Sequence, residues 1–282
     1  MLLNNQKIII LDTTMRDGEL APGVQMNLQQ KLQLAELLEA MKIDIIEVGY
    51  PGYQSKDFHE IVEVSKIVKN STICGLAGSK TAEIRLVSEA LKFAKKPRIH
   101  TYNSVNLPKP TSQKQAEVLN NIKATITLAR NYCDDIQWSA FDATRSEPKF
   151  LCQAVEIAIE SGATTINIPD SMGQASTAEF GQLLQTIFNR VPNIQKVITS
   201  VHCHSDRNLA VSNSLIALEL GARQIECAIN GLGARKGNTD LAQFVKAISQ
   251  KNYPQIALET TLISQASALV TEITKTEKLS KH

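Results

Sequence analysis

The fold class is decided by residues 7–48, KIIILDTTMRDGELAPGVQMNLQQKLQLAELLEAMKIDIIEV. This stretch opens with a β-branched, apolar run at residues 7–11 and closes with a second such run at residues 43–48. Between the two runs, apolar side chains recur at helical spacing, at Leu28, Leu32, Ala35, Leu38 and Met41. A strand, an amphipathic helix and a second strand in this order predict one βαβ unit of a parallel sheet.

The same alternation continues to about residue 250. Apolar strand candidates lie at residues 7–11, 43–48, 71–77, 98–102, 135–140, 164–168, 196–203 and 224–229. Helix candidates lie at residues 28–41, 55–69, 82–94, 115–132, 148–161, 177–190, 208–220 and 240–250. Eight consecutive βα units favour a closed (β/α)8 TIM barrel. A doubly wound open sheet is the alternative, but no G-x-G-x-x-G motif follows the first strand to support it.

The composition describes an ordinary globular protein, in which 43% of the residues are hydrophobic and 21% are charged. The net charge of +2 does not favour binding to nucleic acid or to an anionic membrane, and no apolar stretch approaches the length of a membrane span. The five cysteines, an odd number without a CxxC pair, indicate a reducing compartment. Since the N-terminal residues also lack the usual apolar segment of a signal peptide, we expect a cytoplasmic protein.

Polar residues stand at the carboxyl ends of the predicted strands, where barrel enzymes build their active sites. The most informative are His202 and His204, because side chains two apart on a strand point to the same side. Two imidazoles so placed can bind one metal ion, and the alternative is a pair of satisfied core histidines. Asp12 ends the first strand in a comparable position, so we favour a metal site. Further polar residues at strand ends are Arg16, Glu47, His100, Asp142, Arg145, Asp170 and Ser171.

Several motifs in order resemble the 2-isopropylmalate synthase and homocitrate synthase family. The outer motifs are DTTMRDGE at residues 12–19, HCHSD at residues 202–206 and NGLGARKGN at residues 230–238. Between them lie IEVGYP at residues 46–51, RIHT at residues 98–101, DATR at residues 142–145 and NIPD at residues 167–170. The resemblance covers residues 7–250. It implies a pyruvate carboxyltransferase-like TIM barrel over residues 1–255, followed by a short helical extension at residues 256–282.

The resemblance also implies a divalent metal ion, with a ligand set of Asp12, His202, His204 and Asn238. A mixed oxygen and imidazole set suits Mn²⁺ or Mg²⁺, with Zn²⁺ as an alternative. Cys203 is excluded as a ligand because it points to the other side of the strand.

The implied reaction is a Claisen condensation of acetyl-CoA with a 2-oxo acid. The resemblance places Arg16, Asp17 and Glu47 in catalysis, with Arg16 neutralising the developing negative charge. It places His100, Asp142, Arg145 and Ser171 around the substrate. The alternative roles are structural: a salt bridge between Arg16 and Asp17, a core position for His100, an Asp142–Arg145 pair, and a helix cap at Ser171.

Departures from the family pattern keep two other functions open. Leu20, Phe141 and Ala234 stand where the family has polar residues, Ser205 replaces an asparagine, and the loop at residues 106–110 is rebuilt. An apolar pocket suits a more apolar 2-oxo acid, but it also suits a metal-binding relative without catalysis. A carbon–carbon lyase on the same barrel is the other alternative.

The residues after 255 are expected to begin a missing or truncated C-terminal subdomain. Apolar positions there predict an exposed surface and hence a homodimer: Leu258, Leu262, Ile263, Leu269, Val270 and Ile273. The alternative is a helix that packs on the barrel bottom of the same chain.

Overall fold

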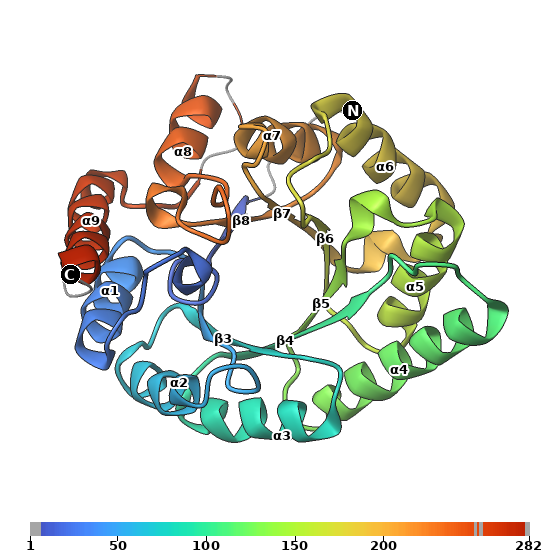
Figure 1. Cartoon of the computed structure of the whole chain (residues 1–282), viewed down its shortest axis with the longest axis horizontal. Helices are drawn as coiled ribbons and strands as arrows, with labels where there is room; N and C mark the ends of the chain where they lie inside the picture. The colour runs from blue at the N-terminus through green and yellow to red at the C-terminus, as the bar shows by residue number, and fades with distance from the viewer. Residues whose placement is uncertain (1–6, 251–252, 254–255, 280–282) are drawn as a thin grey trace.

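The computed structural model describes residues 7–250, 253 and 256–279, and it confirms the predicted TIM barrel. Eight strands pair in parallel and in chain order, and β8 closes the barrel on β1 (Figure 1). The strands are β1 (Ile9–Asp12), β2 (Ile45–Gly49), β3 (Thr72–Ala77), β4 (Pro97–Ser104), β5 (Ile136–Phe141), β6 (Thr165–Asp170), β7 (Ile198–Cys203) and β8 (Gln224–Cys227).

An α-helix follows each strand, and together the helices cover the outside of the barrel (Figure 1). They are α1 (Leu28–Ala40), α2 (Lys56–Ile67), α3 (Thr81–Ala90), α4 (Ser112–Arg130), α5 (Pro148–Glu160), α6 (Thr177–Arg190), α7 (Ala210–Leu220) and α8 (Leu241–Ser249), with α9 (Ile263–Leu279) added after them. Short 3₁₀ turns lie at η1 (Gly18–Leu20), η2 (Leu91–Phe93), η3 (Ala143–Arg145), η4 (Ile194–Lys196), η5 (Ile229–Gly231) and η6 (Thr260–Leu262).

Alternate residues of the strands face the barrel axis. On β1, Leu11 packs with Ile45 and Cys74 in a small apolar cluster, whereas Ile10 belongs to the large core between strands and helices. Other inward positions are polar: the Arg98 guanidinium donates to Gln137 Oε1 at 3.1 Å and to Gln224 Oε1 at 2.7 Å. The interior is therefore filled, and its polar side chains form a floor beneath the carboxyl ends of the strands.

A buried lysine fixes the loop between β1 and α1 against α2. The Lys31 ammonium lies 2.8 Å from Glu19 Oε2 and 2.6 Å from Glu60 Oε2, and its side chain is fully buried. Glu19 also accepts from the backbone N–H of Met26 at 2.6 Å. Because buried charges are costly without partners, this cluster holds the loop in one position next to the barrel mouth.

Helix α9 lies beside α1 and the turn η5 (Figure 1). Val270 and Ile273 are buried, while Leu258, Leu262, Ile263 and Leu269 pack partly buried against the core. The expectation that these positions form an exposed surface is therefore corrected, because the same chain covers them. The sequence-based reason for expecting a homodimer was that exposed surface, so this reason no longer holds. The expected boundary between residues 255 and 256 touches positions 254–255, which lie outside the described residues.

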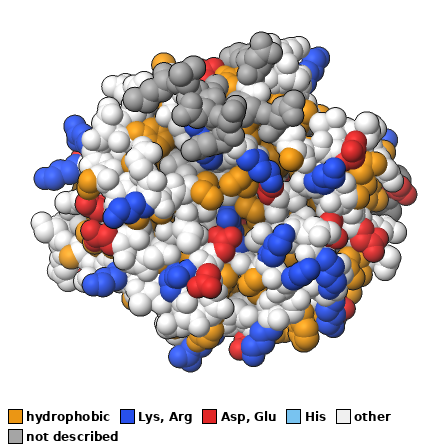
Figure 2. All heavy atoms as spheres, turned by 180° about the vertical axis from the view of Figure 1, so that it is seen from behind, with side chains coloured by type: hydrophobic (Ala, Val, Ile, Leu, Met, Phe, Trp, Pro, Cys, Tyr) orange, Lys and Arg blue, Asp and Glu red, His pale blue; other side chains and the backbone are white. Residues whose placement is uncertain are grey.

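The surface carries charges of both signs. Figure 2 shows Lys and Arg side chains interspersed with Asp and Glu on the face seen from behind, which agrees with the net charge of +2. Among the helices of the described residues, none combines the length and the apolar character that crossing a membrane requires.

Candidate metal centre and active site

The strand ends enclose a cavity of about 420 Å³ at the barrel mouth. Six of the residues singled out by the sequence line it: Arg16, Asp17, His100, Ser171, His202 and His204. They meet because His100 lies inside β4 and the others lie at or after the carboxyl ends of strands in the same closed sheet. The pocket therefore lies where the sequence pattern predicts a site.

Asp17, His202 and His204 form a buried cluster with ligand atoms within 4.8 Å of one another. His202 and His204 lie at the end of β7, and their Nε2 atoms are 3.1 Å apart. Asp17, just before η1, places its Oδ2 atom 3.9 Å from His204 Nε2. One carboxylate and two imidazoles therefore converge on one point.

The hydrogen bonds of the two histidines fix which ring nitrogen carries the proton. Gly237 O can only accept, so His204 Nδ1 donates to it at 3.2 Å. His202 Nδ1 donates to Glu226 Oε2 at 2.8 Å. With both Nδ1 atoms donating, the two Nε2 atoms face each other 3.1 Å apart, where a proton or a metal ion can lie between their lone pairs. Two ligands bound at about 2.1 Å and at a right angle are about 3 Å apart, so the residues fit a divalent ion.

The charges around the cluster act differently on its three members: burial opposes the charged form of His202, but Glu226 outweighs burial and raises the pKa of that imidazole. Burial and the neighbouring His202 lower the pKa of His204 to about 4, so its imidazole is neutral near pH 7. Burial alone would raise the pKa of Asp17, but Arg16 and the two histidines hold it below its usual value. Asp17 is therefore ionised, as a metal ligand requires.

The structure corrects the expectation that Asp12 belongs to this cluster. Both carboxylate oxygens of Asp12 accept from Thr14, one from its backbone N–H at 3.0 Å and one from its hydroxyl at 2.8 Å. Asp12 shares the outward face of β1 with Ile10, whereas Leu11 faces the barrel axis. The carboxylate beside the histidines is Asp17, which the sequence placed in catalysis.

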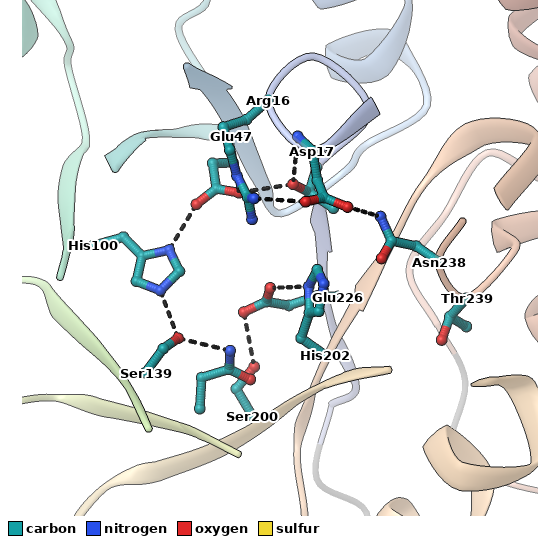
Figure 3. A network of polar contacts seen from close by, with 12 residues as sticks. Arg16, Asp17, Glu47, His100, Ser139, Ser200, His202, Glu226, Asn238 and Thr239 are labelled. Atoms are coloured by element: carbon teal, nitrogen blue, oxygen red, sulfur yellow. Dashed lines mark hydrogen bonds and ion pairs between the residues drawn. The ribbon is translucent and has the colours of Figure 1, made fainter. Parts of the chain in front are cut away.

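Asn238 lies against Asp17, as Figure 3 shows. Its Nδ2 donates to Asp17 Oδ2 at 2.6 Å, while its buried Oδ1 has no hydrogen-bond partner among the described residues. The preceding residue, Gly237, has φ of +87°, and a Cβ there would lie 2.0 Å from Gly231 O. The glycine-rich loop after β8 thus needs a glycine at this point to bring Asn238 to the cluster.

Arg16 and Glu47 extend the site across the barrel floor (Figure 3). Arg16 Nη1 donates to Asp17 Oδ1 at 2.8 Å, and its Nε donates to Glu47 Oε2 at 2.7 Å. Glu47 Oε1 accepts from His100 Nδ1 at 2.6 Å, so His100 Nε2 is left to accept the Ser139 hydroxyl proton at 2.6 Å. Burial opposes ionisation of Glu47, but Arg16 and His100 hold its pKa far below the usual range.

Glu226 is a site residue that the sequence reasoning missed. It is buried inside β8, where it holds His202 and also accepts from Gln137 Nε2 at 2.7 Å. A carboxylate behind a ligating histidine fixes the ring and strengthens it as a ligand. The signal was present in the sequence, since Gln224 and Glu226 place two polar residues at two-residue spacing in a short strand.

The structure separates the other three predicted substrate residues. Ser171 lines the cavity, and its Oγ accepts from the backbone N–H of Asp142 at 2.9 Å. Arg145 makes two hydrogen bonds to Asp142, at 2.8 and 2.6 Å, and neither residue lines the cavity. Asp142 and Arg145 pair with each other, as in the alternative drawn from the sequence, and the pair positions the turn next to Ser171; their substrate role stays a prediction.

Residues 7–270 match the HMGL-like family. This chain belongs to the HMGL-like family. Among curated members, it is 46% identical to a 2-isopropylmalate synthase of Methylorubrum populi over 270 residues, which are 94% of this chain and 52% of that protein. It is also 46% identical to a 2-isopropylmalate synthase of Aquifex aeolicus over 246 residues, which are 86% of this chain and 47% of that protein. The family resemblance drawn from the motifs is confirmed.

Solved structures confirm the HMGL-like fold. The HMG-CoA lyase of Brucella melitensis superposes with a TM-score of 0.80 at 16% identity, over 96% of this chain and 99% of that one. The carboxyl transferase domain of pyruvate carboxylase from Rhizobium etli, solved with pyruvate, superposes with a TM-score of 0.78 at 15% identity, over 97% of this chain and 48% of that one. The chain spans about half the length of the curated 2-isopropylmalate synthases that it matches.

Proposed function

We propose that this HMGL-like barrel is the catalytic part of a metal-dependent acyltransferase that condenses acetyl-CoA with a 2-oxo acid, as in a 2-isopropylmalate synthase. The buried cluster of Asp17, His202 and His204 beside Arg16 carries the proposal. Similarity to curated 2-isopropylmalate synthases over most of the chain supports it.

Asp17, His202 and His204 would hold a divalent ion, Mn²⁺ or Mg²⁺. Asn238 contacts Asp17 through its Nδ2 atom, and its Oδ1 atom has no hydrogen-bond partner among the described residues. When bound, such an ion supplies a Lewis acid for the ketone of the 2-oxo acid. The donor set contains no thiolate, so it does not resemble a structural zinc site.

The remaining residues have separate tasks. Arg16 is held between Asp17 and Glu47, so its guanidinium is preorganised to stabilise negative charge that develops on the former ketone oxygen. Ser171 Oγ already accepts from the Asp142 N–H, which leaves its own proton free to donate to the carboxylate of the acid. Glu47 fixes the His100 tautomer, and His100 in turn orients the Ser139 hydroxyl at the cavity floor.

The test is coenzyme A release, followed with a thiol reagent in the presence of acetyl-CoA, Mn²⁺ and a panel of 2-oxo acids. We expect acid-dependent release that His202→Ala abolishes. Arg16→Lys should lower kcat by about 10²–10³, because a positioned donor to the developing charge is lost.

The matched control is Arg130→Lys, which changes the same residue type on the exposed end of α4 and should leave the rate unchanged. No coenzyme A release with any acid, from a chain that still binds Mn²⁺, would refute the proposed reaction. Acetyl-CoA formation from a 2-substituted malate thioester, without condensation, would instead indicate a lyase.

A further inference from the structure

One side of the cavity is a continuous row of aromatic rings. Tyr53 stacks on Tyr50 with centroids 6.0 Å apart, Tyr50 meets Tyr102 edge-on at 6.2 Å, and Tyr102 meets Phe141 at 6.0 Å. All four line the cavity. These four residues are the aromatic wall.

Exposed apolar side chains gather at this cavity. Of the six large hydrophobic side chains exposed in the described part of the chain, three line this cavity. They are Leu20, Tyr53 and Phe141, which are 40%, 69% and 41% exposed. Exposed apolar side chains gathered at the mouth of a cavity that also holds a charged cluster indicate a ligand with an apolar group.

The Tyr50 hydroxyl has hydrogen-bond partners within the protein. Tyr50 donates its hydroxyl to Glu83 at 2.6 Å and lies 3.5 Å from the Tyr102 hydroxyl. Glu83 lies outside the lining of this cavity, so the polar tip of Tyr50 is satisfied behind the wall. The Tyr50 ring, at the centre of the row, is therefore held in place before any ligand binds, which lowers the entropic cost of binding an apolar group.

The aromatic wall and the metal cluster stand on opposite sides of the mouth. Tyr50 and Tyr53 follow β2, Tyr102 lies on β4 and Phe141 ends β5, whereas Asp17 follows β1 and the two histidines end β7. One cavity joins the two sides. It suits a molecule whose 2-oxo carboxylate end reaches the metal cluster and whose other end is apolar and lies on the rings.

We infer that the acceptor of this barrel is a 2-oxo acid with an aromatic side chain, and that Phe141 and its neighbours in the aromatic wall select it. The inference rests on the proposed condensation for its reaction, but the acid class rests on the wall alone. A branched short-chain acid such as 2-oxoisovalerate has no ring to stack on the wall, while an arylpyruvate carries one.

The first experiment measures binding without catalysis. Phenylpyruvate and 2-oxoisovalerate are titrated by calorimetry into the Mn²⁺-loaded chain, with acetyl-CoA absent. We expect phenylpyruvate to bind at least about tenfold more tightly, in line with what an apolar pocket discriminates. Phe141→Ala should reduce that ratio severalfold, and Phe141→Glu should reverse it, because a carboxylate would face the ring of the acid.

The matched control is Phe93→Ala, since Phe93 is an exposed phenylalanine outside the cavity, against Lys66. The ratio should not change in that variant. Equal or tighter binding of 2-oxoisovalerate, or a ratio that Phe141→Ala leaves unchanged, would overturn the inference. A Phe141→Ala effect on the KM of acetyl-CoA alone would also overturn it, because the wall would then bind the thioester.

Coenzyme A release with the same two acids separates the inference from the proposed function. Selective binding of phenylpyruvate without release from any acid would refute the condensation and keep the acid class. Release with a preference for 2-oxoisovalerate would keep the condensation and refute the acid class. Failure of both acids to bind in the presence of Mn²⁺ would refute both.

Discussion

Replacing Asp17 by asparagine should nearly abolish metal binding, while the same replacement at Asp12 should not. Asp12 ends β1, and Asp17 lies in the loop that follows, five residues later in the same motif. Only Asp17 faces His202 and His204, whereas Asp12 is bound at both oxygens by Thr14. The pair of variants therefore tests the ligand assignment with one chemical change at two positions.

The size of the effect follows from the geometry. Asp17 Oδ2 is 3.9 Å from His204 Nε2, so a cation between them lies within about 4 Å of the carboxylate. Each unit of positive charge on the ion contributes about 4 kcal/mol at that distance and an effective dielectric constant near 20. Since about 1.4 kcal/mol corresponds to a tenfold change and the ion is divalent, Asp17→Asn should weaken Mn²⁺ binding at least about 10³-fold. Asp12→Asn should weaken it less than about tenfold.

The assay is calorimetric titration with Mn²⁺, supported by electron paramagnetic resonance of the free ion. Circular dichroism during thermal unfolding shows whether each variant is folded. Normal Mn²⁺ affinity in folded Asp17→Asn, or an equal loss in both variants, would refute the reasoning that places Asp17 in the cluster.

Three further outcomes follow from the same structure. Glu226→Gln should weaken Mn²⁺ binding about 10–100-fold by loosening His202, and calorimetry showing unchanged affinity would contradict this role. Lys31→Met should cost about 3–5 kcal/mol of unfolding free energy, because buried carboxylates lose their counter-charge; a loss below about 1 kcal/mol in urea would disprove it. Burial would raise the pKa of Glu19, but Lys31 and Lys56 hold it below the ordinary 4.5. Glu19 thus stabilises the fold above that pH, and the stabilisation is lost as the pH falls through its depressed pKa. Glu19→Gln should therefore lose less stability than the unaltered chain between about pH 5 and about pH 3, and parallel pH profiles in thermal unfolding would argue against it.

The strands and helices were predictable because each βα unit carries its pattern locally. Every expected strand and helix is present, and the ends shift by a few residues where the structure adds a local constraint. The helix expected from residue 208 begins at Ala210, because Asn208 has a positive φ of +57°. The strand expected to reach residue 229 ends at Cys227, where the chain turns into η5. Such ends depend on hydrogen bonds to other segments, which a local pattern does not contain.

The sequence by itself determined the barrel, its open end and the pair of histidines, because strand alternation is a local property with a period of two residues. The tertiary structure decided the rest of the site. It selected Asp17 over Asp12, because the closed barrel fixes which face of β1 looks inward. It brought Glu226 behind His202 and joined two rings from the loop after β2 with rings from β4 and β5 into one wall, because barrel closure sets the distances between segments far apart in the chain.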